Sequence, residues 1–181
     1  MGHDKALLSW GDTDLLGHAL ERLSAVTDDA RILAGAEPRY SQRGVPVVTD
    51  PVTDRGPMAG LLAALEAARG GPALLLGVDL PLVPVGLLAR LLALAGHADA
   101  VVPVSRRGPE PLCAVYGACC LDPVRRCVER KDLKMTAFWT RVRVQEVGPD
   151  QLGAFGDPDE LFLNVNAPED YQSALTLARR P

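Results

Sequence analysis

Aromatic residues and long hydrophobic runs are scarce in this chain of 181 residues. Phe, Trp and Tyr together make up only 4% of it, so a hydrophobic core has to be built from Leu, Val and Ala. Glu66, Arg69, Asp79 and Arg90 interrupt the apolar stretches, which excludes the run of roughly 20 apolar residues that a membrane helix needs. The polar residues Met1–Lys5 are not followed by a hydrophobic stretch, so the sequence predicts neither a signal peptide nor a membrane partner.

An excess of basic charge is also missing. The chain has 19 Lys and Arg against 23 Asp and Glu, for a net charge of −4. Nucleic acids and anionic membranes bind proteins through basic surfaces, so this balance disfavours both as main partners. Apolar residues make up 48% and charged residues 23%, which is the composition of an ordinary globular domain of this length.

Metal-binding cysteine motifs are absent as well. The four cysteines fall within fifteen positions without C-x-x-C spacing and with no histidine among them: Cys113, Cys119, Cys120 and Cys127. This pattern disfavours a disulfide framework and a zinc site, and it is typical of reduced thiols in a cytoplasmic protein. The three histidines are scattered along the chain and are assigned no role.

Short apolar segments alternate with segments of helical periodicity along the whole chain. This alternation predicts a single α/β domain over residues 1–181, with a doubly wound, mainly parallel sheet and helices on both faces. The expected strands are 30–34, 45–49, 73–78, 100–104, 112–116, 141–147 and 161–165. The expected helices are 15–23, 56–69, 84–96, 122–130, 135–140 and one that begins at Pro168.

An aspartate follows two of the expected strands at their carboxyl ends. Asp50 comes after 45–49 and Asp79 comes after 73–78. Each one alone is equally well explained as a solvated loop residue or a helix cap. In doubly wound sheets, however, ligands bind at the carboxyl ends of the strands. Two carboxylates at that edge are what a Mg²⁺ ion bridging phosphates requires, because this cation takes oxygen ligands.

Five segments, in order along nearly the whole chain, resemble motifs of one enzyme family. Met1–Leu7 resembles the tail of the nucleotidyltransferase signature L-A-G-G-x-S-x-R-M-G-x-D-K. The other four are Asp50 with the later G-P-M-A-G (56–60), V-D-L-P-L-V-P (78–84), E-P-L-C-A-V-Y (110–116) and F-L-N-V-N-A-P-E-D (162–170). Together they most resemble the molybdenum cofactor guanylyltransferases. The paired asparagines before P-E-D favour these over the related cytidylyltransferases.

The resemblance implies a fold and a reaction. The fold is the Rossmann-like nucleotidyltransferase fold. The reaction is a Mg²⁺-dependent transfer of GMP from GTP to molybdenum-carrying molybdopterin, with release of pyrophosphate. It would run in the cytoplasm, with molybdenum-insertion proteins or molybdoenzyme chaperones as further partners. Such transfers depend mainly on positioning and charge neutralisation, for which lysines and metal-binding carboxylates are suited.

The resemblance also assigns roles to individual residues. Lys5 and Asp79 are the expected catalytic residues, and both are expected to bind the nucleotide. Asp79 is the expected metal ligand, and Lys5 would lie against the phosphates as a mobile point charge. Lys5 is one of only three lysines beside sixteen arginines. Outside the M-G-x-D-K context, a lysine so close to a chain end is better explained as part of a solvated tail.

Two further groups of residues complete the expected site. Asp50, Gly56, Pro57 and Gly60 are expected to bind the nucleotide, although a plain turn into a helix also explains the glycine–proline segment. Asn164 and Asn166 are expected to bind the pterin. On a strand the two asparagines are at positions i and i+2, so their side chains would point to the same face. An Asx turn before Pro168 explains Asn166 equally well.

The sequence departs from the family pattern in two places. The first strand and the glycine-rich L-A-G-G-x-S-x-R loop are not among the 181 residues, which predicts an open slot in the sheet flanked by unpaired strand edges. Three explanations are open: a start assigned at an internal Met1, trimming at a disordered loop, or a degenerate protein that binds the cofactor without catalysis. Ala34-Gly35 also lacks the asparagine that guanylyltransferases often carry there. This second departure leaves open a cytidylyltransferase or another nucleotidyltransferase on the same fold.

Overall fold

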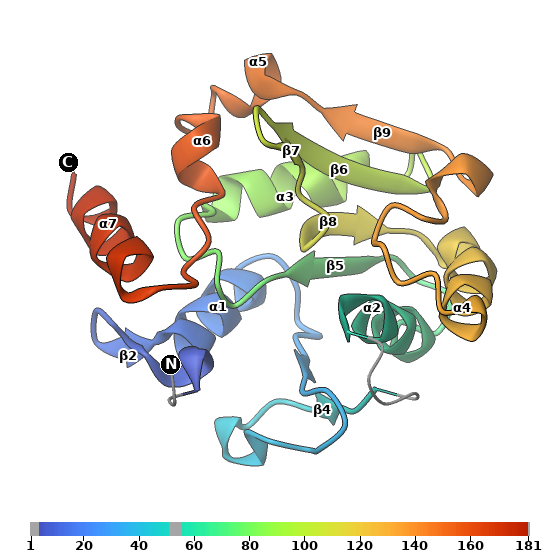
Figure 1. Cartoon of the computed structure of the whole chain (residues 1–181), viewed down its shortest axis with the longest axis horizontal. Helices are drawn as coiled ribbons and strands as arrows, with labels where there is room; N and C mark the ends of the chain where they lie inside the picture. The colour runs from blue at the N-terminus through green and yellow to red at the C-terminus, as the bar shows by residue number, and fades with distance from the viewer. Residues whose placement is uncertain (1–3, 51–55, 181) are drawn as a thin grey trace.

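Helices cover both faces of a central β-sheet in the computed structural model, which describes residues 4–50 and 56–180 (Figure 1). The strands are β1 (Ser9–Trp10), β2 (Thr13–Asp14), β3 (Ile32–Leu33), β4 (Val47–Val48), β5 (Ala73–Leu76), β6 (Ala100–Ser105), β7 (Gly108–Pro109), β8 (Cys113–Tyr116) and β9 (Val144–Val147). The α-helices are α1 (Leu15–Ser24), α2 (Gly56–Ala67), α3 (Val85–Leu94), α4 (Leu121–Arg130), α5 (Pro149–Leu152), α6 (Pro158–Leu161) and α7 (Pro168–Ala178). Four 3₁₀ helices connect them: η1 (Lys5–Leu7), η2 (Ser41–Arg43), η3 (Ala118–Cys120) and η4 (Trp139–Arg141).

The central sheet has the order β5-β8-β6-β7, with β9 on the other edge of β6. Strand β8 is antiparallel to both β5 and β6, whereas β9 is parallel to β6. The prediction of an α/β fold with helices on both faces is therefore confirmed. The prediction of a mainly parallel sheet is correct for β5, β6 and β9, which all run in the same direction. Strand β8 lies between β5 and β6 and runs the other way, so the sheet is mixed. The reason is the short connection from β6 to β8, because a parallel crossover needs a dozen or more residues.

Two hydrophobic layers sandwich this sheet. On one face α2 and α4 pack against alternate residues of β5, β6 and β8, including Leu75, Val102 and Tyr116. On the other face α3 packs against Val101 and Val115. The side chains alternate between the two faces because successive residues of a strand point to opposite sides. Within the first layer, the buried Tyr116 hydroxyl donates to the Pro111 carbonyl at 2.9 Å.

A smaller region carries the N-terminal third of the chain. Strands β3 and β4 pair in parallel, and β1 and β2 form an antiparallel ribbon. Helix α1 begins after Asp14, whose side chain caps it by accepting from the Gly17 amide at 2.8 Å. Arg43 forms an ion pair with the same carboxylate. This ion pair ties the segment between β3 and β4 to the start of α1.

Two of the expected elements are wrong. Residues 161–165 are not a strand, because α6 ends at Leu161 and the following residues form an irregular segment. Phe162 is buried against the α3 layer and Val165 against α7, so the segment crosses between two clusters instead of following a strand. Residues 135–140 form turns that lead into η4 and not an α-helix.

The four cysteines are free thiols, three of them buried and Cys119 exposed. Burial raises the pKa of Cys120 to about 12, which keeps this thiol protonated. Among the described residues, no helix is long and apolar enough to cross a membrane.

Candidate active site at the carboxyl end of strand β5

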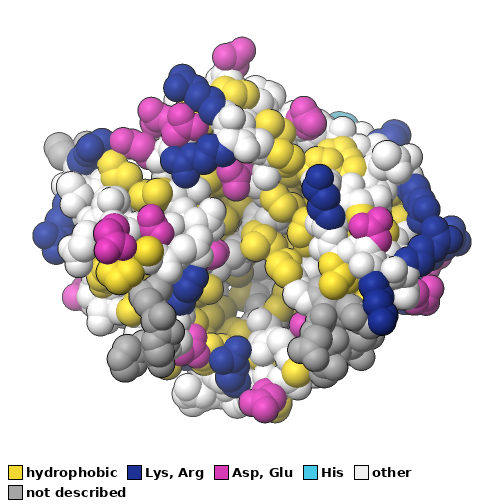
Figure 2. Space-filling model, in the orientation of Figure 1, with side chains coloured by type: hydrophobic (Ala, Val, Ile, Leu, Met, Phe, Trp, Pro, Cys, Tyr) yellow, Lys and Arg dark blue, Asp and Glu magenta, His cyan; other side chains and the backbone are white. Residues whose placement is uncertain are grey.

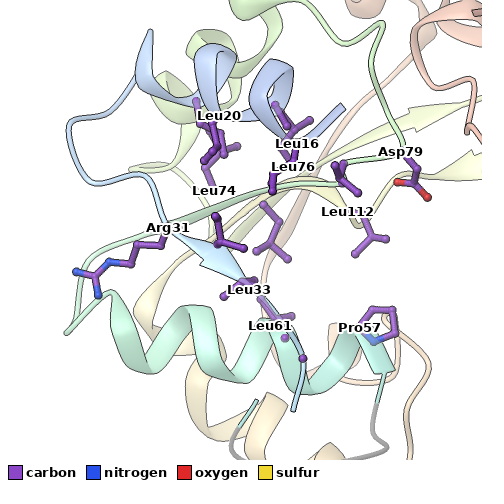
Figure 3. Close-up of a pocket in the computed structure, with 18 of the residues that line it drawn as sticks. Leu16, Leu20, Arg31, Leu33, Pro57, Leu61, Leu74, Leu76, Asp79 and Leu112 are labelled. Atoms are coloured by element: carbon purple, nitrogen blue, oxygen red, sulfur yellow. The ribbon is translucent and has the colours of Figure 1, made fainter. Parts of the chain in front are cut away.

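A cavity of about 370 Å³ opens between β3 and β5. Leu16 and Leu20 of α1 lie on one side of it, and Leu61 of α2 lies on the other (Figure 3). The space-filling view shows hydrophobic side chains lining a central hollow, with charged side chains around it (Figure 2). Asp79 lies at the end of the cavity where β5 finishes.

The Asp79 carboxylate is held at this end by the loop that follows β5. The Asp79 carbonyl accepts from the Val165 amide at 2.9 Å, which attaches this loop to the C-terminal segment. Burial raises the pKa of Asp79, and the nearby Lys5 ammonium opposes that rise. A carboxylate with an incomplete hydration shell has free lone pairs for a cation.

Lys5 and Asn166 meet beside this carboxylate although they lie 161 positions apart. The Lys5 ammonium donates to the Asn166 side-chain oxygen at 2.6 Å. Lys5 begins η1, whose cap is the Asp4 carboxylate accepting from the Ala6 amide at 3.1 Å. The Tyr40 hydroxyl donates to the same Asp4 carboxylate at 2.5 Å. The N-terminal segment that carries Lys5 is thus anchored on two sides.

Asn166 is presented by the turn that starts α7. The Asp170 carboxylate accepts from the Asn166 amide at 3.0 Å and from the Ala167 amide at 2.8 Å, which fixes the turn. A carboxylate in the first turn is also favourable because of the helix dipole. Asn164 lies two residues earlier, half-buried, and makes no side-chain hydrogen bond to the described residues. The two asparagines share a loop, not a strand face.

The remaining expected nucleotide-binding residues line the same cavity as Asp79. They are Asp50, Gly56, Pro57 and Gly60. One carboxylate oxygen of Asp50 is buried and has no hydrogen-bond partner among the described residues. Burial also raises the pKa of Asp50. A buried acceptor without a partner is costly, so this oxygen is available for a ligand donor. Residues 51–55, between Asp50 and Gly56, lie outside the described part.

The donor set at this edge fits a magnesium ion that completes its coordination with substrate. Asp79 offers a carboxylate, and Asp50 lines the same cavity. In the described residues no group of three His, Cys, Asp or Glu side chains gathers to form a metal cage. Mg²⁺ in nucleotide sites is commonly held by one or two carboxylates, waters and phosphate oxygens, so such a cage is not required.

Three residues that position this site were not predicted from the sequence. Gly77 lies so close to Asp79 that a Cβ on it would be 2.7 Å from the carboxylate oxygen. Arg22 donates to the Val83 carbonyl at 2.7 Å, and it also donates to the His18 ring nitrogen at 2.7 Å. That nitrogen is 3.0 Å from the Pro81 carbonyl. The only signal in the sequence was that His18 and Arg22 lie four positions apart on α1, at i and i+4. This spacing does not indicate which loop the two side chains contact.

The mixed sheet, with a lysine and a desolvated carboxylate at the carboxyl end of its edge strand β5, defines an α/β protein suited to binding a nucleotide phosphate chain. Comparison with known proteins agrees with this class. The chain belongs to the MobA-like NTP transferase family, whose domain matches residues 1–145. It is similar to proteins named molybdenum cofactor guanylyltransferase, such as that of Cereibacter sphaeroides, with 33% identity over 99% of this chain and 90% of the relative.

Solved structures show the same fold. The molybdopterin-guanine dinucleotide biosynthesis protein A of Archaeoglobus fulgidus matches with a TM-score of 0.84 and 23% identity, over 98% of this chain and 91% of that one. A Mycobacterium tuberculosis protein in complex with manganese matches with a TM-score of 0.71 and 23% identity, over 97% of this chain and 93% of that one.

The contact between Gly77 and Asp79 generates a prediction. Gly77→Ala should push the Asp79 carboxylate out of place and lower the affinity for divalent metal by about 10- to 100-fold, as displaced metal-site supports do. Calorimetric titration with Mn²⁺ and GTP measures this. The matched control is Gly86→Ala on α3, whose Cβ would meet Phe155 at an ordinary 3.5 Å. Equal metal affinity in the two variants would contradict the positioning role.

The half-buried His18 generates a pH prediction. Burial lowers the pKa of His18, so the unfolded chain takes up a proton before the folded one does. The free energy of unfolding should therefore fall as the pH drops below about 6.5, the ordinary histidine value, and recover above it. Urea unfolding between about pH 8 and pH 5.5, on either side of that value, measures this slope. His18→Gln should reduce this slope, whereas the control His97→Gln, at an exposed position, should leave it unchanged. An unchanged slope in His18→Gln would show that His18 is not the cause of the pH dependence.

Proposed function

We infer that this chain transfers GMP from GTP to molybdenum-carrying molybdopterin, forming molybdopterin guanine dinucleotide and releasing pyrophosphate. The observation that carries this inference is the meeting of Lys5, Asp79 and Asn166 at the carboxyl end of β5. A cation, a carboxylate and a neutral amide lie at one edge of the sheet, although they come from both ends and the middle of the chain. Relatives that match over nearly their whole length carry the same activity in their names.

The reaction makes one bond and breaks one bond at the α-phosphorus of GTP. An oxygen of the molybdopterin phosphate attacks this phosphorus, and the bridging oxygen to the β-phosphorus leaves with the pyrophosphate. Both reactants are anionic, so the main barrier that the protein can lower is charge repulsion. Lys5 is placed to reduce it, because its ammonium donates to a neutral amide and can exchange Asn166 for a phosphate oxygen.

Asp79 is the residue that would hold the metal. When bound, Mg²⁺ supplies positive charge to the phosphate oxygens and orients them. Desolvation of Asp79 raises the energy of its ionised form in the free protein, so a bound cation relieves part of that cost. A Mycobacterium tuberculosis protein of the same fold is in complex with manganese, which is also a divalent cation.

The nucleotide and pterin are assigned to opposite sides of Asp79. Asp50, Gly56, Pro57 and Gly60 line the cavity on the α2 side. One Asp50 oxygen has no partner among the described residues, and it would accept a donor from the base or ribose. Asn164 and Asn166 lie on the α7 side. Amide side chains both donate and accept, which matches the mixed donors and acceptors of a pterin and its phosphate.

The setting of the reaction follows from its chemistry. Four free thiols, three of them buried, suit a reducing compartment, and we propose that the reaction takes place in the cytoplasm. Molybdenum-insertion proteins would supply the pterin substrate, and molybdoenzyme chaperones would receive the product.

Removing either charged group should abolish most of the activity. Asp79→Asn and Lys5→Met should each lower the rate of pyrophosphate release from GTP, in the presence of molybdopterin and Mg²⁺, by about 100- to 1,000-fold. Matched controls on exposed positions are Asp122→Asn and Lys134→Met, which should keep the full rate. Competition among GTP, CTP and UTP in the same assay should favour GTP.

Two outcomes would redirect the assignment. Preference for CTP or UTP would indicate another nucleotidyltransferase on this fold. Molybdopterin binding that is indifferent to GTP, to Mg²⁺ and to Lys5→Met would indicate a cofactor-binding protein without catalysis.

A further inference from the structure

Another cavity lies on the far side of the loop that carries Asp79. It too has a volume of about 370 Å³, and Trp10 and His18 line it at one end of the chain while Leu161 and Leu177 line it at the other. Helices α1, α6 and α7, which supply much of this lining, lie on the same side of the molecule in Figure 1. We call this cavity the rear groove. Among the described residues, it has no lining residue in common with the active-site cavity.

Helix α1 and the loop after β5 form the wall between the two cavities. Leu16 of α1 lines the active-site cavity, whereas His18 of the same helix lines the rear groove. In the loop, Asp79 lines the active-site cavity, whereas Pro81 lines the rear groove. A molecule in the rear groove would therefore contact the loop that carries Asp79 without entering the active site.

The Arg22 guanidinium lines this groove, half-buried, and forms no ion pair within the described part of the chain. It donates to the His18 ring nitrogen and to the Val83 carbonyl, each at 2.7 Å. Both acceptors are neutral, because a ring nitrogen that accepts a hydrogen bond carries no proton. Every other half-buried arginine among the described residues pairs with a carboxylate: Arg31, Arg43 and Arg125.

This environment favours the binding of an anion beside Arg22. Burial lowers the pKa of Arg22, and the neighbouring Glu21 carboxylate only partly opposes that effect. A desolvated charge without a counter-ion is costly, so an anion that reaches the guanidinium gains a charge-assisted hydrogen bond and removes part of the cost. Only two of the N–H donors of Arg22 are used within the described residues. The remaining donors can bind a ligand while the bond to Val83 stays in place.

Apolar side chains form other walls of the groove. They are the buried Trp10 ring, Leu82, Leu161 and Leu177. The volume lies near the lower end of the range of about 300–1,000 Å³ in which small organic molecules bind, so a stretch of polypeptide is a poorer match. The groove therefore suits a compact ligand with an apolar body.

Two carboxylates on the α6 side disfavour a highly charged ligand. Asp157 accepts from the Asp159 amide at 2.9 Å, and Glu160 forms an ion pair with Arg180 at 2.8 Å. Both carboxylates line the groove and already have partners, unlike Arg22. Their negative charge repels further anionic groups, so the groove favours one anionic group on the ligand and disfavours a nucleotide phosphate chain.

We propose that the rear groove is a second ligand site, which binds a small monocarboxylate with an apolar body. The ligand carboxylate bonds to Arg22, because a planar guanidinium matches the geometry of a carboxylate. The apolar body lies against Trp10 and the leucines of the groove. This binding is independent of the reaction inferred above, because it uses none of the residues assigned to GTP or molybdopterin.

The experiment titrates the ¹⁵N-labelled 181-residue chain with benzoate, benzyl alcohol and benzylamine and follows the two tryptophan indole N–H signals by NMR. The probes share an aromatic ring and differ in charge. Trp10 lines the groove, whereas Trp139 packs against a different core cluster and serves as the internal control.

Benzoate should shift the Trp10 signal to saturation and leave the Trp139 signal unchanged. It should bind about tenfold or more tightly than benzyl alcohol, because it adds a charge-assisted hydrogen bond to the same apolar contacts. Benzylamine, with the opposite charge, should bind more weakly than benzyl alcohol. Saturating GTP with Mn²⁺ should not displace benzoate, because the two cavities are lined by different residues.

Two variants test the groove itself. Arg22→Met should reduce the benzoate affinity to that of benzyl alcohol, but it also removes the bond to Val83. The second variant therefore keeps Arg22: Ala178→Phe, at an exposed position that lines the groove, should fill it and abolish binding. The matched control Ala118→Phe, at an exposed position on η3, should bind benzoate like the original chain.

Several results would overturn the proposal. Benzoate that leaves Trp10 unchanged, or that shifts both tryptophans alike, does not bind in the groove. Equal affinity for benzyl alcohol would show apolar contact without recognition of the anion. Displacement by GTP would place benzoate in the active site, and unchanged binding in Ala178→Phe would place it elsewhere on the protein.

Discussion

A carboxylate kept partly out of water at the end of a sheet strand is the constraint on which this structure depends. The Asp79 side chain follows closely after β5, and its surroundings raise its pKa because they withdraw hydration. Such a group destabilises the free protein, so the fold must hold it there. The Val165 amide donates to the Asp79 carbonyl, and the Arg22 guanidinium donates to the Val83 carbonyl further along the same loop. Two segments distant in sequence therefore keep the loop that carries the carboxylate in place.

The site forms only when the two ends of the chain come together. Lys5 and Asn166 are separated by most of the sequence, and their hydrogen bond joins η1 to the start of α7. Figure 1 shows both segments on the same side of the molecule. Because each is anchored separately, by Asp4 with Tyr40 and by Asp170, the Lys5 ammonium can exchange its partner while the backbone stays in place.

The apolar cavity and the charged groups of the active site are two parts of one feature. Leu16 and Leu20 of α1 and Leu61 of α2 line the cavity between β3 and β5, and Asp79 lies at the end where β5 finishes. The cavity is therefore apolar along its length and carries a carboxylate at one end.

The sequence by itself determined the helices α1, α2, α3, α4 and α7, the buried strands, the α/β class and the two aspartates that follow strands. These depend on local periodicity, on proline and glycine at helix starts, and on short apolar runs, all of which are written in neighbouring residues. Tertiary structure alone decided that β8 enters antiparallel, that residues 161–165 cross between two clusters, and that Gly77, His18 and Arg22 position the Asp79 loop. Their geometry depends on contacts between segments far apart in the chain, for which a single sequence carries no local signal.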